Sequence, residues 1–177
     1  VVVMGTGEPM DNYDNIVRFV HLLSDENGLN ISQRNITVST CGIVPKIYEL
    51  AKEKLQITLA LSLHAPNDEI RRQTMPIANR YTIGEMPIAQ RYSMDEVLDA
   101  CRNYFQETGR RITFEYSLVA GVNDSDEDAR ELSSRIHDIN CHVNLIPVNP
   151  IKERSYRRST HQAVENFKIK LEKCGIN

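Results

Sequence analysis

The feature that most constrains the fold is a regular alternation of apolar runs with segments whose apolar residues recur at helical spacing. Runs typical of buried strands lie at residues 1–4, 35–40, 57–63, 111–119 and 142–148. Helical spacing follows each run, around residues 16–23, 45–51, 93–109, 125–136 and 160–173. Strands that alternate with helices are typical of parallel βαβ units. We therefore predict an α/β fold, most simply a partial (β/α) barrel, with an open doubly wound sheet as the alternative.

The 177 residues suit one domain, so we expect residues 1–177 to form a single domain. In either architecture, ligands bind at the carboxyl ends of the strands. Every predicted strand runs into small and polar residues there: GTGEP, STCG, SLHAPN, GVND and PVNP. This pattern predicts one polar site for a small molecule, formed by several strand ends together.

The first of these segments, Gly5-Thr6-Gly7-Glu8-Pro9, looks like a glycine loop for phosphate. Glu8 brings a negative charge, however, and Pro9 has no N–H to offer an anion. A carboxylate beside glycines is better matched to a cationic group such as an ammonium. Glu8 could also cap a helix start, a common position for acidic residues.

Four further side chains at the strand ends are candidates for the same site. Ser39 and Ser62 are either ligand-binding hydroxyls or ordinary turn hydroxyls. We interpret His64 as a hydrogen-bonding residue rather than a metal ligand, because no metal partner accompanies it in sequence. Asn149 offers an amide donor and acceptor, held between Val148 and Pro150. The sequence assigns no catalytic nucleophile and base.

Composition limits the other classes of function. The net charge of -3 gives the chain no general attraction for nucleic acid, so an RNA contact needs a local patch. Residues 152–158, KERSYRR, are either such a patch or a solvated face. No apolar stretch approaches the roughly 20 residues that span a bilayer. The cysteines match no metal motif, which favours reduced thiols and a cytoplasmic location: Cys41, Cys101, Cys141 and Cys174.

A tandem duplication interrupts the alternation after the third strand. Residues 75–85, MPIANRYTIGE, are followed at once by residues 86–96, MPIAQRYSMDE. Two copies are too few for a repeat architecture, and the proline in each prevents one continuous helix. We interpret the duplication as a loop insertion, because surface loops accept extra length at modest entropic cost.

Taken together, six motifs resemble a known family. In chain order they are GTGEP, ITVSTCGIVP, LALSLHAPND, RRQTMPI, GRRITFEYSL and CHVNLIPVNP. The set resembles the radical S-adenosylmethionine enzymes that methylate C2 of adenine in 23S ribosomal RNA and transfer RNA, and the resemblance runs over the whole chain. It implies a partial β/α barrel and a binding site for S-adenosylmethionine formed by Gly7, Glu8, Ser39, Ser62, Leu63, His64 and Asn149.

The family's chemistry, as the resemblance implies, uses a [4Fe–4S] cluster on a Cys-x3-Cys-x2-Cys motif, two molecules of S-adenosylmethionine and a methyl-accepting cysteine. None of the four cysteines matches these positions. The chain also begins with Val and ends on KCGIN, so we expect a fragment that is inactive alone and whose cluster ligands lie outside it. The resemblance further implies an electron donor such as flavodoxin and a monomeric enzyme. The family pattern has one MPI…RY copy, so the duplication is a departure.

Three alternatives stay open from the sequence. A sister family of antibiotic-resistance enzymes methylates C8 of adenine and shares much of the pattern. An unrelated β/α-barrel lyase or isomerase would need a lysine or an acid pair at a strand end, and none is evident. A noncatalytic RNA-binding domain is disfavoured by the acidic net charge.

Overall fold

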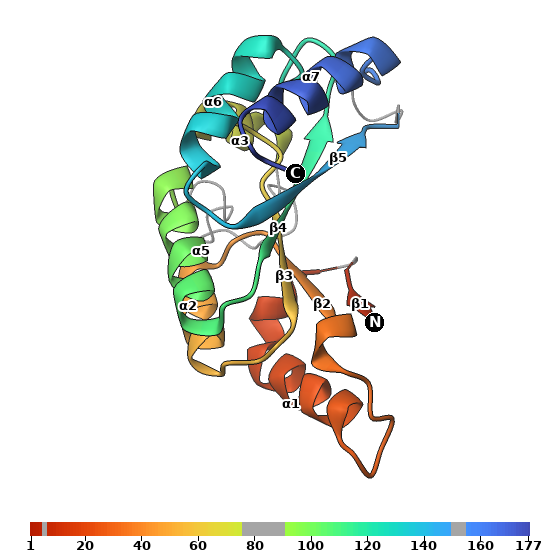
Figure 1. Cartoon of the computed structure of the whole chain (residues 1–177), viewed down its shortest axis with the longest axis vertical. Helices are drawn as coiled ribbons and strands as arrows, with labels where there is room; N and C mark the ends of the chain where they lie inside the picture. Colours follow the sequence, from red (N-terminus) through yellow and green to blue (C-terminus); the bar gives the residue numbers. More distant parts are fainter. Residues whose placement is uncertain (5–6, 76–90, 150–154) are drawn as a thin grey trace, which may run out of the picture.

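The computed structural model describes residues 1–4, 7–75, 91–149 and 155–177. Within them, five parallel strands form one sheet in the order β1-β2-β3-β4-β5 (Figure 1). The strands are β1 (Val2–Val3), β2 (Thr37–Thr40), β3 (Thr58–Ser62), β4 (Ile112–Leu118) and β5 (Cys141–Pro147). A doubly wound sheet reverses its strand order at a switch point, and this sheet does not. The partial barrel is therefore confirmed and the doubly wound alternative is wrong.

Helices follow the strands, as the alternation predicts. They are α1 (Tyr13–Ser24), α2 (Val44–Lys52), α3 (Asp68–Thr74), α5 (Met94–Thr108), α6 (Asp126–Ile136) and α7 (His161–Lys173), with short 3-10 helices η1 (Pro9–Asn12) and η2 (Gln33–Asn35). The helix α3 was not predicted, because its seven residues lack a clear apolar stripe. It begins at Asn67, whose side chain accepts a hydrogen bond from the N–H of Ile70 at 3.0 Å.

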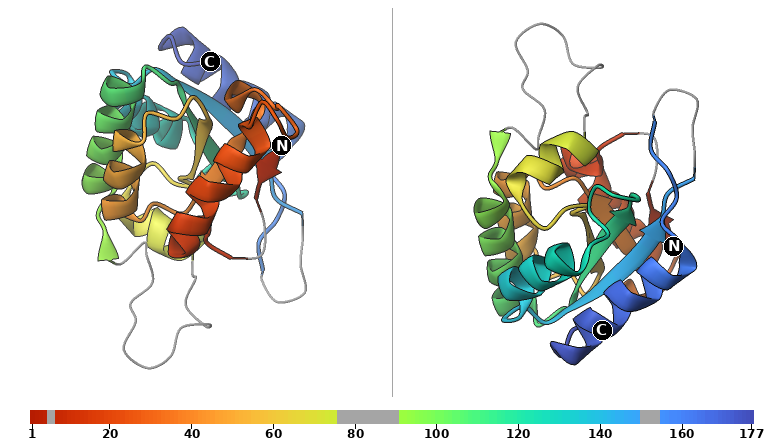
Figure 2. Two further views of the ribbon diagram at one scale, coloured as in Figure 1. Left: turned by 90° about the horizontal axis from the view of Figure 1, so that it is seen from below. Right: turned by 90° about the horizontal axis from the view of Figure 1, so that it is seen from above.

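The two faces of the sheet differ in chemistry because successive side chains on a strand point to opposite faces. Register pairs Leu61 of β3 with Phe114 of β4, and both are fully buried. The next residue pair, Ser62 and Glu115, lies on the other face. The helices lie around the outside of the curved sheet (Figure 2). The inner face thus carries the polar side chains, which places them where a barrel binds its ligand.

Local sequence signals set the helix ends. Ser93 and Glu96 form the predicted capping box at the start of α5, and Gly109 ends this helix with a left-handed φ of 66°. Residues 76–90, which hold most of the duplication, lie outside the described residues, as do residues 150–154 of the basic segment. In the described part of the chain, no helix is long and apolar enough to cross a membrane.

Candidate functional site

A cavity of about 250 Å³ lies at the carboxyl ends of β1, β2 and β3. Its lining includes four of the predicted site residues: Gly7, Glu8, Ser39 and Ser62. The remaining lining residues are Met4, Pro9, Thr40 and Cys41. Since β1, β2 and β3 are parallel neighbours, residues distant in sequence meet at one edge of the sheet, as the strand-end rule predicts.

Glu8 is held in this cavity by two backbone hydrogen bonds. Its Oε1 accepts from the N–H of Met10 at 2.9 Å, and its Oε2 accepts from the N–H of Cys41 at 2.6 Å. Glu8 is therefore the N-cap of η1, so the capping role is real. A carboxylate has about four lone-pair sites, and these bonds use one on each oxygen. The half-buried carboxylate can still bind a cation in the cavity.

The histidine lies just outside this lining, in an unusual backbone conformation. His64 has a φ of 58°, and its Nδ1 accepts a hydrogen bond from the N–H of Ser117 at 3.0 Å. Burial, together with the nearby Arg71 cation, lowers the pKa of His64 to about 4. The ring is thus neutral at physiological pH, and its proton is on Nε2 because Nδ1 is an acceptor. His64 can act as a neutral hydrogen-bond donor.

The other two predicted residues do not line the cavity. The Leu63 side chain is fully buried in the core, and its N–H donates to the carbonyl of Glu115 at 3.0 Å. Only its main chain is available to a ligand. Asn149 follows β5, is exposed, and lies at the far edge of the sheet from β1.

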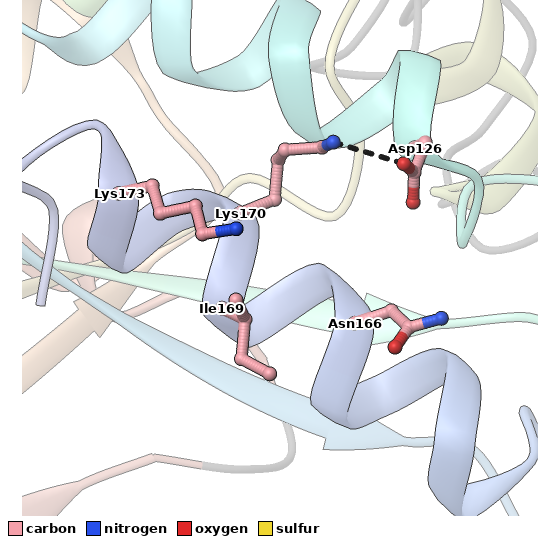
Figure 3. A pocket seen from close by; sticks show the side chains of 5 residues that line it. All are labelled: Asp126, Asn166, Ile169, Lys170 and Lys173. Atoms are coloured by element: carbon pink, nitrogen blue, oxygen red, sulfur yellow. Dashed lines mark ion pairs between the residues drawn. The ribbon is translucent and has the colours of Figure 1, made fainter.

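A second cavity, of about 270 Å³, lies on the outer helices and has the wrong charge for a cationic ligand. It is lined by residues of α6 and α7, including Asp126, Lys170 and Lys173 (Figure 3). The carboxylate of Asp126 is already paired with Lys170 at 2.9 Å, a contact that holds the pKa of Asp126 below its usual range. Lys173 adds a further positive charge, so an ammonium group favours the strand-end cavity.

Known proteins resemble this chain in sequence over its whole length. The family model described as "Radical SAM superfamily" matches residues 1–133. The chain belongs to the radical SAM superfamily. The "Probable dual-specificity RNA methyltransferase RlmN" of Lachnospira eligens is 63% identical over 177 residues, which cover 100% of this chain and 47% of that protein. Its namesake in Clostridium novyi is 59% identical over 176 residues, which cover 99% of this chain and 48% of that protein.

Two solved structures share the radical SAM fold. A radical SAM methyltransferase from Sphaerobacter thermophilus matches with a TM-score of 0.84 and 46% identity, over 99% of this chain and 48% of that one. A domain of pyruvate-formate lyase-activating enzyme from Bacteroides vulgatus matches with a TM-score of 0.69 and 12% identity, over 100% and 95% of the two chains. The latter shows the fold alone. The chain spans about half the length of the curated relatives that it matches.

Sequence reasoning missed a buried amide that fixes the backbone of His64, next to the candidate site. The side chain of Asn123, fully buried, accepts from the N–H of Val119 at 2.8 Å and donates to the carbonyls of Ser117 at 2.8 Å and His64 at 2.9 Å. Asn123 thereby ties the exit of β4 to the strained backbone of His64. The only signal in the sequence was an asparagine in the loop after a strand, which is equally common in ordinary turns.

Glu115 was also missed, although it lies on the inner face of the radical SAM barrel beside Ser62. It is 7% exposed, and its carboxylate accepts from Nδ2 of Asn144 on β5 at 2.8 Å. The signal was present in the sequence of β4, where the polar residues Thr113, Glu115 and Ser117 alternate with apolar and aromatic ones.

The cysteines and acidic side chains of the described residues do not form a metal site. The described ranges contain no group of three or more His, Cys, Asp or Glu residues that could hold a metal ion. Burial, reinforced by Glu8, raises the pKa of Cys41 to about 12, and burial raises that of Cys101 to about 12. Both thiols are therefore protonated at neutral pH, so neither is a reactive thiolate in this site.

The donors that are present fit the amino acid end of S-adenosylmethionine. The cavity offers a carboxylate for an ammonium, hydroxyls at Ser39 and Ser62, and Gly7, which has a φ of 115° and open space for 4 Å around the point where a Cβ would lie. A polar cavity of this kind suits a small charged ligand.

Proposed function

We propose that this chain is the cofactor-binding core of a radical SAM RNA methyltransferase, which methylates C2 of adenine in 23S ribosomal RNA and transfer RNA. The observation that carries the proposal is the strand-end cavity, which Glu8, Ser39 and Ser62 line together inside a radical SAM barrel. Two relatives, at 63% and 59% identity, are named as RNA methyltransferases, which supports RNA as the substrate.

In this proposal, each residue binds or orients S-adenosylmethionine. Glu8 accepts hydrogen bonds from the methionine ammonium, and Gly7 leaves room for that group. The hydroxyls of Ser39 and Ser62 bind polar groups of the cofactor. We further assign the Leu63 main chain, the neutral Nε2–H of His64 and the amide of Asn149 to the same ligand.

The family's [4Fe–4S] cluster would be held by residues outside this chain and would supply the electron for reductive cleavage of S-adenosylmethionine. The residues of this chain fix the position of the cofactor for that cleavage. An electron donor such as flavodoxin, a cytoplasmic location and a monomeric state complete the proposal. We assign the methyl-accepting role to none of the four cysteines, because none of them matches the family's position for that residue.

Product analysis of the full-length, cluster-loaded protein tests this function. Unmethylated 23S ribosomal RNA fragments and transfer RNA are incubated with S-adenosylmethionine and a reductant, then digested for mass spectrometry against 2-methyladenosine and 8-methyladenosine standards. We expect 2-methyladenosine in both RNAs. The C8 isomer would transfer the protein to the sister family, and no methylated adenosine in either RNA would overturn the proposal.

A further inference from the structure

A fully buried guanidinium lies behind the candidate cofactor site. Arg71 of α3 is 0% exposed, and it is the only buried lysine or arginine in the described parts of the chain. Its Nη2 donates to the carbonyl of Cys41 at 2.8 Å and its Nη1 to the carbonyl of Tyr92 at 3.5 Å. Its Nε is buried and has no hydrogen-bond partner among the residues that the structure describes. A buried charge is costly to keep, so this cation needs an explanation beyond packing.

The first partner of Arg71 connects it to the cofactor site. The carbonyl of Cys41 accepts from Arg71, and the N–H of the same residue donates to Oε2 of Glu8 at 2.6 Å. One residue of the loop after β2 thus joins the buried cation to the carboxylate in the cavity. If the main chain of Cys41 rotates, the carboxylate loses one of its two backbone hydrogen bonds and keeps only the one from Met10.

The next residue in that loop shows how closely the chain surrounds the cation. Gly42 has a φ of 99°, and a Cβ placed there would lie 3.2 Å from Nη2 of Arg71. Any other residue would be strained by its backbone and crowded by the guanidinium. The loop conformation and the position of Arg71 are therefore set together.

We propose that Arg71 is a positioning residue for S-adenosylmethionine. It fixes the main chain of Cys41, whose N–H aims the carboxylate of Glu8 at the methionine ammonium. This inference rests on the proposed function, because it requires that Glu8 binds the cofactor. The competing explanation is a purely structural one, in which Arg71 only joins α3 to the segment that contains Tyr92.

A double-mutant cycle separates these two explanations. In the full-length, cluster-loaded protein, the dissociation constant of S-adenosylmethionine is measured by calorimetry for wild type, Arg71→Met, Arg71→Lys, Glu8→Gln and the two combinations. We expect about tenfold weaker binding for Arg71→Met and a smaller loss for Arg71→Lys, which keeps a charge and a donor. Because the effect passes through Glu8, most of each loss should vanish in the Glu8→Gln background.

A control variant and measurements of folding separate a loss of cofactor binding from a general loss of structure. Arg102→Met is the control, because Arg102 also donates to a carbonyl, that of Arg135, and in addition to the carboxylates of Asp99 and Asp138. None of these residues lines the strand-end cavity. Arg102→Met should lower the melting temperature and leave the dissociation constant unchanged. Circular dichroism and iron content establish which Arg71 variants fold, and Arg71→Lys carries the cycle if Arg71→Met does not.

The results distinguish a failure of the positioning role of Arg71 from a failure of the proposed function. If Glu8→Gln weakens binding and the Arg71 losses stay the same in that background, the positioning role is overturned and the proposed function stands. If Glu8→Gln leaves the affinity unchanged, the proposed role of Glu8 is overturned, and the inference on Arg71 falls with it. A reduced loss in the Glu8→Gln background, with a normal cluster spectrum in electron paramagnetic resonance, supports the inference.

Discussion

Replacing Asn123 by alanine should destabilise the protein more than any comparable surface change. The substitution removes three hydrogen bonds of 2.8 to 2.9 Å at a fully buried position. The N–H of Val119 has no other partner among the described contacts, while the carbonyl of His64 keeps a bond from Thr74 at 3.2 Å. With about 1 kcal/mol for each bond and more for a buried unpaired N–H, we expect a loss of about 3–4 kcal/mol.

Urea unfolding of the full-length protein, followed by circular dichroism, measures this loss. Asn166→Ala is the matched control, because Asn166 is exposed on α7 and bonds only the side chain of Gln162. Its cost should stay within about 0.5 kcal/mol. Asn123→Asp keeps the shape but turns a carboxylate toward two carbonyls, so it should cost at least as much as alanine at neutral pH. Equal costs for the two alanine variants would refute the reasoning.

Three further variants test the site and its supports. Gly42→Ala should cost about 1–3 kcal/mol more than Gly109→Ala in urea unfolding, since both have left-handed backbones but only Gly42 has atoms within 3.4 Å of a new Cβ; equal costs would contradict this. Ser93→Ala should lower the free energy of unfolding by about 1 kcal/mol through loss of the capping box with Glu96. An unchanged free energy would show that the capping box does not stabilise the protein. His64 has a pKa of about 4 in the folded protein, so the unfolded state takes up the proton at a higher pH and stability falls as the pH drops from 6.5 to 4. His64→Asn should flatten this dependence of stability on pH. An identical slope in the variant would argue against a buried neutral ring.

Much of the fold could be predicted because period and strand-end chemistry are local signals. The apolar runs and the capping box placed every long element, and the alternation indicated a parallel sheet. The choice between a barrel and a doubly wound sheet needed strand order, which depends on contacts between distant segments. The short helix α3 escaped because Asp68–Thr74 is mostly charged and polar and begins only at the cap of Asn67.

The candidate site was predicted in part for the same reason. Glu8, Ser39 and Ser62 were found because each lies at a strand end, and parallel strands end at one edge. Arg71 and Asn123 could not be found, because arginines and loop asparagines are most often exposed and only the tertiary fold buries these two. The double role of Glu8, as a helix cap and as a carboxylate in the cavity, also became visible only in the structure.

The most direct test of the central claim is the affinity of S-adenosylmethionine for Glu8→Gln in the full-length, cluster-loaded protein, measured by calorimetry beside Glu26→Gln as an exposed control. Glutamine keeps one oxygen for the cap but removes the charge. We predict binding weakened about tenfold or more, because a hydrogen bond to a charged group contributes about 1.5–3 kcal/mol, and no change for the control. An unchanged dissociation constant for Glu8→Gln would contradict the claim that this carboxylate binds the cofactor.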